Sequence, residues 1–426
     1  MSSNTPTPSV PAVASAVTLD QLKRQAKRLL KSYRDGSTDA RQQFSQHPQQ
    51  VPADNAQLTD AQLVLARSLG ADSWPRLRRH VLGRDLRQAI WNSDADSVRE
   101  TIDEEADILN DAGQHPRWGG RPTALQLAAE RGQVDIARML LERGADRQGD
   151  EGEYGWTPLQ LAAHWGHTEV VDLLLGVGEP VDIFSAALLG DVVCVRRLLD
   201  EDSSRATTAG LSEAPPIHFV TTREIVDLLL QHGARMDTVD SMGNTPVASA
   251  INRGEQSYDV AVFLLEHGAP ATPCELAALG RTEQLLQLLD TDAGAIDFVG
   301  NIGLNAVRGT PLLAAVHTGQ VATVRALLER GADATARADM GQTSLHLTGS
   351  TGIAQLLIDA GADPTAVDDE HGTTPLTWAR IDIDIQGDSP ERQKLVKFFE
   401  GLEQSYYRYS VRAGQIMPGS SCHVRI

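Results

Sequence analysis

One frame of residues recurs along this chain at intervals of about 33 residues. The stretch GWTPLQLAAHWGHTEVVDLLL (155–175) shows the whole frame: a Thr-Pro pair, an Ala-rich segment, a Gly and a Leu-rich segment. Its Thr157 lies 34 residues after Thr123, and farther along the chain Thr343 lies 33 residues after Thr310. Such a period is the sequence signature of a solenoid, in which no single unit buries its own apolar face and neighbouring units must stack.

Each position of the frame favours a unit of two helices. Thr caps free N–H groups at the start of the first helix, and Pro suits the first turn, where its missing donor costs nothing. Leu and Ala at helical spacing form a buried stripe. A glycine suits the left-handed residue that ends this helix, at Gly132, Gly166, Gly254 and Gly319. A second glycine ends the second helix, at Gly144, Gly233, Gly268, Gly331 and Gly361.

Weaker copies of the frame fill the gaps between the clear ones. Three degenerate copies, at 86–106, 183–202 and 274–292, keep both helices and are followed by longer connections, and the first two lack the Thr-Pro pair. The copy at 215–234 is shortened by about three residues, as is the one at 342–362. We therefore predict a higher-order unit of about three repeats, used three times and followed by a closing repeat, or about ten repeats in all.

The recurring residues, TPLxxA followed by G and then LLxxGAD, resemble the ankyrin repeat, and the array they form covers residues 84–404. The resemblance implies an all-α fold, a solenoid of helix-turn-helix repeats with β-hairpin-like connections. It also implies a concave groove lined by the hairpin tips and by the exposed ends of the inner helices. The expected function is non-catalytic: a scaffold or adaptor that binds an unknown protein partner through this groove.

The resemblance maps candidate partner-binding residues onto the groove. They occupy the pair of positions before the helix-ending glycine or the hairpin tips: Trp91, Trp118, Glu130, Arg131, Tyr154, Trp156, His164, Trp165, Met242, Asn252, Arg253 and His317. Four of the six tryptophans fall in the first three repeats. Trp and Arg are the usual anchors of interfaces, each worth about 2 kcal/mol or more when central. The alternative is that these rings fill packing gaps left by long hairpins and the N-terminal cap.

The net charge of −19 is unevenly distributed. Residues 1–82 carry 11 Lys/Arg and 6 Asp/Glu, whereas the remainder carries 27 and 51. An acidic array repels phosphate backbones, so we expect it to bind no nucleic acid. The charge also favours a soluble, monomeric protein.

The two ends of the chain differ from the array. Residues 1–17 are rich in Ser, Pro, Thr and Ala and are expected to be disordered. Residues 18–83 predict a helical extension, which resembles the leader found before some bacterial ankyrin arrays. Its first helix carries a basic face, either a solvated cap or a docking surface for an acidic partner, an anionic membrane or nucleic acid. At the other end, 389–404 predicts a capping helix and 405–426 a tail without a period.

No segment of the sequence directs the protein to a membrane or across one. The N-terminus lacks a signal-peptide pattern, and no window approaches the roughly 18 apolar residues of a spanning helix. The three cysteines, Cys194, Cys274 and Cys422, are scattered at no metal spacing. This usage is typical of a reducing compartment, so we predict a cytoplasmic protein.

The histidines follow the frame. His218 and His346 fall at the fourth position of the TPLH segment, and His232 and His267 fall near the end of a second helix, where a cation complements the helix dipole. We therefore predict structural or interface histidines, with no metal and no cofactor.

Catalytic motifs are missing from the sequence. It contains no Gly-rich phosphate loop, no GxSxG and no HExxH. One alternative stays open, an enzyme whose pocket is walled by Trp118, Trp156, His164 and a long connection. That alternative predicts a deep, closed cavity, whereas the binding hypothesis predicts a shallow groove.

Overall fold

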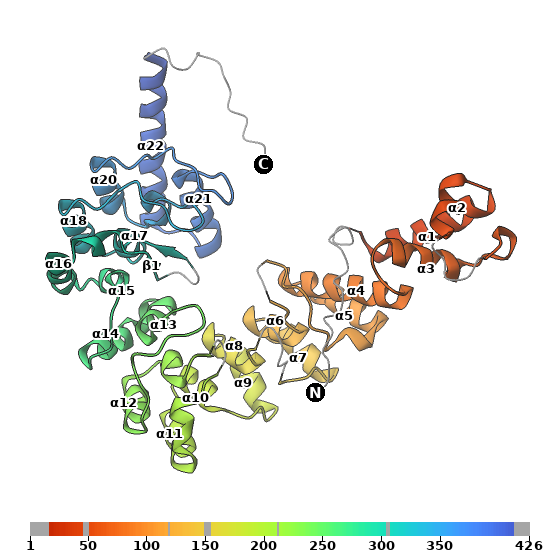
Figure 1. The fold of residues 1–426 in the computed structure, drawn as a ribbon, viewed down its shortest axis with the longest axis horizontal. Helices are drawn as coiled ribbons and strands as arrows, with labels where there is room; N and C mark the ends of the chain where they lie inside the picture. Colours follow the sequence, from red (N-terminus) through yellow and green to blue (C-terminus); the bar gives the residue numbers. More distant parts are fainter. Residues whose placement is uncertain are drawn as a thin grey trace. The chain divides into compact units, whose positions relative to one another are not determined.

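The structure is a computed structural model that describes residues 17–45, 51–117, 120–148, 155–210, 213–303 and 307–412. The chain forms two compact units, Met1–Pro180 (unit 1) and Val181–Ile426 (unit 2), each considered by itself. Helices make up most of the described residues, and the strands among them are the two-residue pair β1 (Gly300–Asn301) and β2 (Arg308–Gly309) (Figure 1). The all-α prediction is confirmed.

Unit 1 begins with helices that precede the repeats: α1 (Leu19–Arg34), α2 (Thr38–Phe44), α3 (Leu58–Ser68) and α4 (Trp74–Trp91). Thr18 starts α1 through a capping box with Gln21. The apolar face of α1, including Leu22 and Ala26, is buried and packs against α3. Helix α4 runs without a break across residue 83, so one helix belongs both to the extension and to the first repeat.

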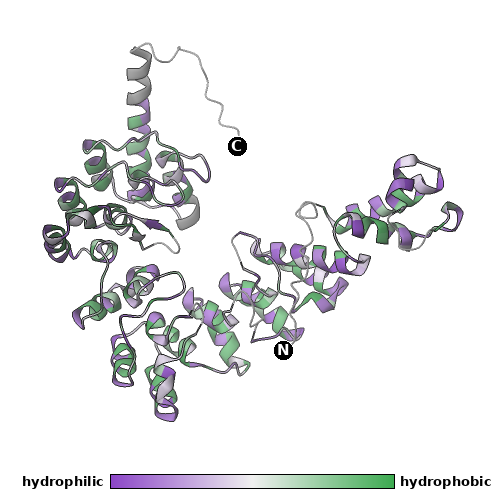
Figure 2. Cartoon of the chain, viewed as in Figure 1, coloured by the Kyte–Doolittle hydropathy of each residue, from purple (hydrophilic) through white to green (hydrophobic). Residues whose placement is uncertain are grey.

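Three helix pairs follow in unit 1. Helix α4 pairs with α5 (Ala95–Glu104), α6 (Ala124–Glu130) with α7 (Val134–Glu142), and α8 (Pro158–His164) with α9 (Thr168–Gly176). The first helices α4, α6 and α8 pack side by side, and α5, α7 and α9 form a second layer. Figure 2 shows apolar residues concentrated where helices face one another and polar residues at the turns.

Unit 2 contains seven further pairs of elements, arranged in the same two layers. The first layer consists of α10 (Ile183–Leu189), η6 (Pro216–Phe219), α13 (Pro246–Asn252), α15 (Pro273–Ala278), α17 (Pro311–His317), α19 (Ser344–Leu347) and α21 (Pro375–Gln386). The second consists of α11 (Val192–Glu201), α12 (Arg223–Gln231), α14 (Tyr258–Glu266), α16 (Thr282–Thr291), α18 (Val321–Glu329), α20 (Thr351–Asp359) and α22 (Pro390–Arg412). With unit 1, the described residues contain the ten predicted repeats.

The closing helix α22 begins where the sequence predicts. The Ser389 hydroxyl oxygen accepts a hydrogen bond from the Arg392 N–H at 3.3 Å. Leu395, Val396 and Phe399 bury the side of α22 that faces the repeats. The helix continues beyond residue 404 to Arg412, into the stretch expected to be a tail.

The Thr-Pro or Thr-Ala start of a first helix also ties neighbouring repeats together. Gln126 Oε1 accepts a hydrogen bond from the Thr123 N–H at 2.7 Å, which closes the capping box of α6. The other end of the same amide, Nε2, donates to the Trp156 carbonyl oxygen of the next repeat at 2.6 Å. The helix ends at Glu130, and Gly132 just beyond it has φ +66° and sits against the His167 ring, so a side chain there would fit neither the backbone nor the space.

The two shortened repeats lose most of their first helix. In one repeat this helix is the 3₁₀ turn η6, and in the other it is the four-residue α19. His218 on η6 bridges Ser249 Oγ at 3.1 Å and Thr238 Oγ1 at 3.0 Å. His346 on α19 contacts the Thr343 hydroxyl, and its Nε2 donates to the Thr373 carbonyl oxygen at 2.9 Å. Both histidines therefore hold a short repeat to its hairpin, which agrees with their predicted structural role.

Candidate binding surface

The ends of the first helices in unit 1 bring predicted residues together. Trp91, Glu130 and His164 are the last residues of α4, α6 and α8. Asn92, Arg131 and Trp165 cap the C-termini of the same helices. Because α6 packs against both α4 and α8, these six residues form one line across three repeats, here called the unit 1 row.

Trp91 is the centre of a cluster of cationic and aromatic groups. The guanidinium carbon of Arg131 lies 4.3 Å from the centroid of the Trp91 ring, and that of Arg117 lies 5.8 Å from it. The His115 ring meets the same indole edge-on, with centroids 5.3 Å apart. Arginine over an indole ring is the most favourable cation–π arrangement in proteins. Arg131 is exposed, whereas Trp91 is partly buried beneath it.

Glu130 faces the interior of the repeat. Its carboxylate oxygen Oε1 lies 3.4 Å from His115 Nε2, and both side chains are almost fully buried. Its carbonyl oxygen lies 2.9 Å from Nε2 of His167 in the next repeat. Glu130 thus positions the histidine that backs Trp91, and its carboxylate is turned away from the surface.

A ladder of three rings lies one repeat farther along. Trp156 meets His164 with centroids 5.0 Å apart, and His164 meets Trp165 at 5.2 Å, both edge-on. Trp156 and His164 are partly buried, and Trp165 is 47% exposed. Edge-to-face contacts of this kind orient the rings, so the outermost indole is held in one place.

The predicted residues of unit 2 occupy different environments. Met242 is 56% exposed at a hairpin tip, where its N–H donates to the Asp240 carboxylate at 2.9 Å. Asn252 and His317 are partly buried at the ends of α13 and α17, and burial lowers the pKa of His317 below its usual value.

Arg253, at the end of α13, is bonded to the preceding repeat. It donates to the carbonyl oxygens of His218 at 2.7 Å and Val220 at 2.6 Å. Burial lowers the pKa of its guanidinium to about 10. This side chain therefore offers a partner little surface. Two further predicted residues, Trp118 and Tyr154, lie outside the described residues.

Exposed apolar residues at the hairpins of unit 2 were missed by the sequence analysis. Val239 and Val367 precede the equivalent aspartates Asp240 and Asp368, and both are more than two-fifths exposed. Met340 occupies the same tip position as Met242 and is also exposed. The recurring Val-Asp pair at the hairpins is the signal that would have identified the two valines.

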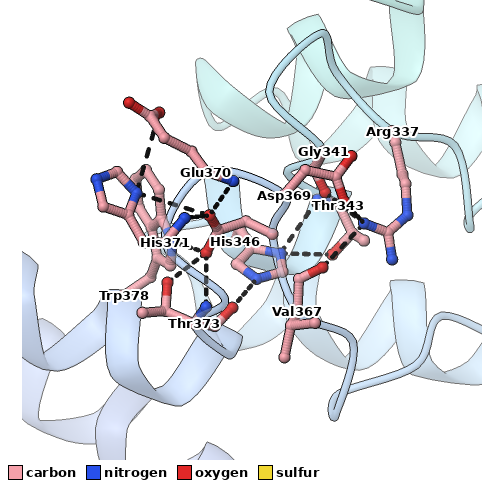
Figure 3. Close-up of polar contacts among 11 residues, drawn as sticks. Arg337, Gly341, Thr343, His346, Val367, Asp369, Glu370, His371, Thr373 and Trp378 are labelled. Carbon is pink, nitrogen blue, oxygen red and sulfur yellow. Dashed lines mark hydrogen bonds and ion pairs between the residues drawn. The ribbon is translucent and has the colours of Figure 1, made fainter. Parts of the chain in front are cut away.

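Hydrogen bonds to the Asp368 carboxylate hold together the hairpin that contains His371 and Thr373, which Figure 3 shows. The buried carboxylate accepts hydrogen bonds from the His371 N–H at 2.6 Å, the Thr373 N–H at 3.0 Å and Trp378 Nε1 at 3.2 Å. Burial alone would raise the pKa of Asp368, but these donors outweigh it and hold the pKa below its usual range. Arg337 joins this hairpin to the preceding one, because it donates to the Val367 carbonyl oxygen at 2.9 Å.

The basic face of α1 is a second exposed feature of unit 1. Arg24, Lys27, Arg28 and Lys31 are exposed, and none forms an ion pair within the described part of the chain. Lys23 is different, because its Nζ lies 3.2 Å from Glu104 Oε1. The buried apolar face of α1 packs in the fold, so only the basic face is presented outward.

Neither a metal centre nor a membrane span is found in what the structure describes. Across these residues, no three His, Cys, Asp or Glu side chains converge as a metal site requires. None of the described helices is both long and apolar enough to cross a bilayer.

Comparison with known families identifies the repeats. The family model described as "Ankyrin repeats (3 copies)" matches residues 86–185, 183–273 and 275–368, which is more than half of the chain. Each matched stretch begins at or next to the start of one of the three degenerate copies, which agrees with the predicted higher-order unit of about three repeats.

Similar proteins occur in fungi, plants and animals. "Ankyrin repeat protein nuc-2" of Neurospora crassa is 28% identical over 49% of this chain and 18% of its own length. "E3 ubiquitin-protein ligase XBAT33" of Arabidopsis thaliana is 29% identical over 45% of this chain and 38% of its own length. "Cyclin-dependent kinase 4 inhibitor B" of Rattus norvegicus is 30% identical over 34% of this chain and 93% of its own length. The chain thus spans well under half of the first two relatives, and these three come from eukaryotes, so the predicted bacterial character gains no support from them.

Proposed function

Because this chain belongs to the ankyrin repeat family, whose repeats serve protein–protein interaction, we propose that it is a non-catalytic scaffold or adaptor that binds its partner through the unit 1 row. The single observation that carries the proposal is the exposure of Trp165 at the end of α8. Among the described residues it is the one tryptophan that is more than a third exposed. An exposed indole that packs on one neighbouring ring is the kind of side chain that dominates binding energy at interfaces.

The contacts beneath the row support the same proposal. His164 contacts the Trp165 ring and is itself backed by Trp156, and Trp91 lies against the Arg131 guanidinium. Side chains that are already ordered lose little conformational entropy when a partner binds. The row therefore presents its anchors at a low entropic cost.

A pull-down from source-cell lysate, analysed by mass spectrometry, tests the proposal. The variant is Arg131→Ala/Trp165→Ala in the full chain. The matched control is Val193→Ala, which removes an apolar side chain that is 79% exposed on the second-layer helix α11. We expect partners that the control retains and the double variant loses, while circular dichroism and thermal melting show both variants to be folded.

Identical partner lists for the wild type, the control and a folded double variant would contradict the proposal. The rings would then serve packing alone. The hairpin tips of unit 2, with Met242 and Met340 exposed, would be the next surface to vary.

The unpaired basic face of α1 favours a second candidate function, an adaptor tethered to an anionic membrane. The test is cosedimentation with phosphatidylserine/phosphatidylcholine vesicles at rising salt. Lys27→Glu/Arg28→Glu/Lys31→Glu should abolish salt-sensitive binding, because surface cations contribute about 1 kcal/mol each. Lys394→Glu/Lys397→Glu, on exposed positions of α22, is the control. Equal sedimentation of wild type and the α1 variant would exclude the tether.

The proposal also includes the location, the oligomeric state and the absence of a nucleic-acid ligand, each argued from the amino-acid composition. We place the protein in the cytoplasm as a monomer without a nucleic-acid ligand, because its cysteines are scattered and its array is acidic. Sedimentation velocity of the purified chain tests the monomer, and a dimer at micromolar concentration would contradict it.

A further inference from the structure

We infer that the unit 1 row binds an extended acidic peptide segment of about six residues, with a carboxylate on Arg131 and an apolar or aromatic side chain on Trp165. This inference rests on the proposed function and names the chemistry of its partner. Two independent features carry it, the unpaired cations around Trp91 and the exposed ring at the next helix end.

The two arginines that lie over Trp91, one of them in the row, lack carboxylate partners among the described residues. Arg131 and Arg117 both lie over Trp91, and neither forms an ion pair within the described residues. Other arginines of these repeats do pair, as Arg143 does with Asp103 at 3.1 Å. In a chain with a net charge of −19, two unpaired guanidinium groups over one indole ring form a local anion site. The planar guanidinium suits the two oxygens of a carboxylate.

Two acidic side chains at or just after these helix ends are already engaged. The Glu130 carboxylate is buried and faces His115. The Asp94 carboxylate, just beyond α4, accepts hydrogen bonds from the Ser97 N–H at 3.0 Å and the Ser97 hydroxyl at 2.7 Å. Neither carboxylate is therefore placed to neutralise Arg131, and an incoming carboxylate meets uncompensated positive charge.

Trp165 supplies the apolar half of the site. Its ring is nearly half exposed and stands edge-on to His164, with an interplanar angle of 89°. An aromatic or aliphatic side chain from a partner would cover the exposed indole, and ring pairs of this kind contribute about 0.5–1.5 kcal/mol beyond area burial. Arg131 and Trp165 cap consecutive first helices, so both halves of the site lie along one line.

The spacing of helices sets the length of the bound segment. Packed helices lie about 8–10 Å apart, so the three helix ends of the row span about 16–20 Å. An extended chain advances about 3.3 Å per residue, and five or six residues cover that distance. The carboxylate and the apolar side chain then stand about three residues apart in the partner.

Nucleic acid is the competing occupant, because bases stack on exposed indoles and phosphates bind arginine. Among the described residues the site offers two unpaired guanidinium groups, and the array around it is strongly acidic. A polyanion that continues past the row meets repulsion, whereas a short acidic peptide does not. The observations therefore favour the peptide.

Selection from a phage-displayed library of random dodecapeptides on the immobilised full chain tests the inference. Parallel selections use Arg131→Glu, Trp165→Ala and the control Arg138→Glu, which reverses the charge of an exposed arginine on the second-layer helix α7. Wild type and control should enrich peptides with Asp or Glu about three residues from an aromatic or aliphatic residue. Arg131→Glu should lose the acidic preference and Trp165→Ala the apolar one.

Fluorescence anisotropy with the enriched peptide, labelled with fluorescein, then gives the magnitudes. Each variant should weaken binding about thirtyfold, the loss expected for an interface anchor of about 2 kcal/mol. Replacing the peptide's acidic residue with its amide should remove most of the difference between wild type and Arg131→Glu. The control should bind within about twofold of wild type.

The outcomes separate this inference from the proposed function. Enriched peptides that depend on Trp165 but are basic or uncharged would overturn the inference and leave the proposed function standing. Peptides that bind wild type and both row variants equally, or no enrichment at all, would overturn both. Tighter binding of a fluorescein-labelled oligothymidine than of any acidic peptide, lost in Arg131→Glu, would replace the peptide with nucleic acid.

Discussion

Arg131 in unit 1 and Arg253 in unit 2 occupy the same position of the repeat, yet their side chains lie in different environments and make different contacts. Each caps the end of a first helix, α6 or α13. Arg131 lies exposed over Trp91, whereas Arg253 is partly buried and donates to two carbonyl oxygens of the preceding repeat. The difference comes from the neighbour, because the repeat before Arg253 has only the 3₁₀ turn η6 in place of its first helix.

The short 3₁₀ turn η6 in the preceding repeat explains why Arg253 bonds to that repeat. A longer α-helix bonds all but its last four carbonyl groups internally, but at η6 and the residue after it the carbonyls of His218 and Val220 accept from the next repeat. The Arg253 guanidinium supplies the missing donors. A repeat position is thus a binding residue or a packing residue according to the length of the repeat beside it.

Substituting Arg131 or Arg253 with alanine should give the largest difference in the free energy of unfolding between the two positions. Arg253→Ala leaves two inward carbonyl groups without donors, so we expect it to lower the free energy of unfolding by about 3 kcal/mol. Arg131→Ala removes an exposed side chain and should cost less than about 0.5 kcal/mol. Urea denaturation followed by circular dichroism measures both. Equal decreases in the free energy of unfolding would show that the two arginines contribute equally to stability.

Low pH should destabilise the folded chain at the same shortened repeat, through His218. Burial lowers the pKa of His218 to about 4, so this ring is neutral in the folded chain and binds a proton more readily when unfolded. Its contribution to stability is therefore complete above about pH 6.5 and declines as the pH falls toward 4, by about 3 kcal/mol in total.

The variant His218→Asn keeps a polar group and removes this titration. Between pH 7 and pH 4.5, its free energy of unfolding should fall less than that of the wild type, as measured by urea denaturation at each pH. Arg253 and Asp240 are the charged groups that act on His218 and are present in both proteins. Parallel curves for the two proteins would assign the acid sensitivity to other groups.

The tryptophans of the unit 1 row should give the smallest stability effects and sharpen the distinction between packing and binding. Trp91 is partly buried against His115 and Arg131, so Trp91→Ala should cost about 1–2 kcal/mol. Trp165→Ala should cost less than about 1 kcal/mol, because the ring is exposed. Thermal melting compares them. A larger loss for Trp165→Ala would make it a packing residue and weaken the proposed function.

Much of the fold was predictable because its signals are local. The Thr at the N-cap, the Pro in the first turn and the glycine with positive φ act within a few residues of themselves, as at Thr157, Pro158 and Gly166. Their recurrence at a constant period was enough to predict ten repeats and an all-α fold. The two shortened copies were also visible, because their missing residues change the period.

The candidate surface was predictable only as a set of positions. The frame placed Glu130, Arg131 and Arg253 in equivalent pairs before a helix-ending glycine, but it could not tell which of them faces solvent. Glu130 turns inward to His115, which lies in a long connection with no fixed place in the frame. The exposed valines at the hairpins were missed because they belong to no helical stripe.

The sequence by itself determined where the first helices of the repeats begin and about how many repeats there are, since capping and turn preferences depend on neighbours along the chain. Only the tertiary structure decided that Trp165 stands exposed against the His164 ring and that Arg253 is bonded to the repeat before it. The reason is physical. Burial and hydrogen bonding at a helix end depend on the length and connection of the adjacent repeat, which a local frame does not contain.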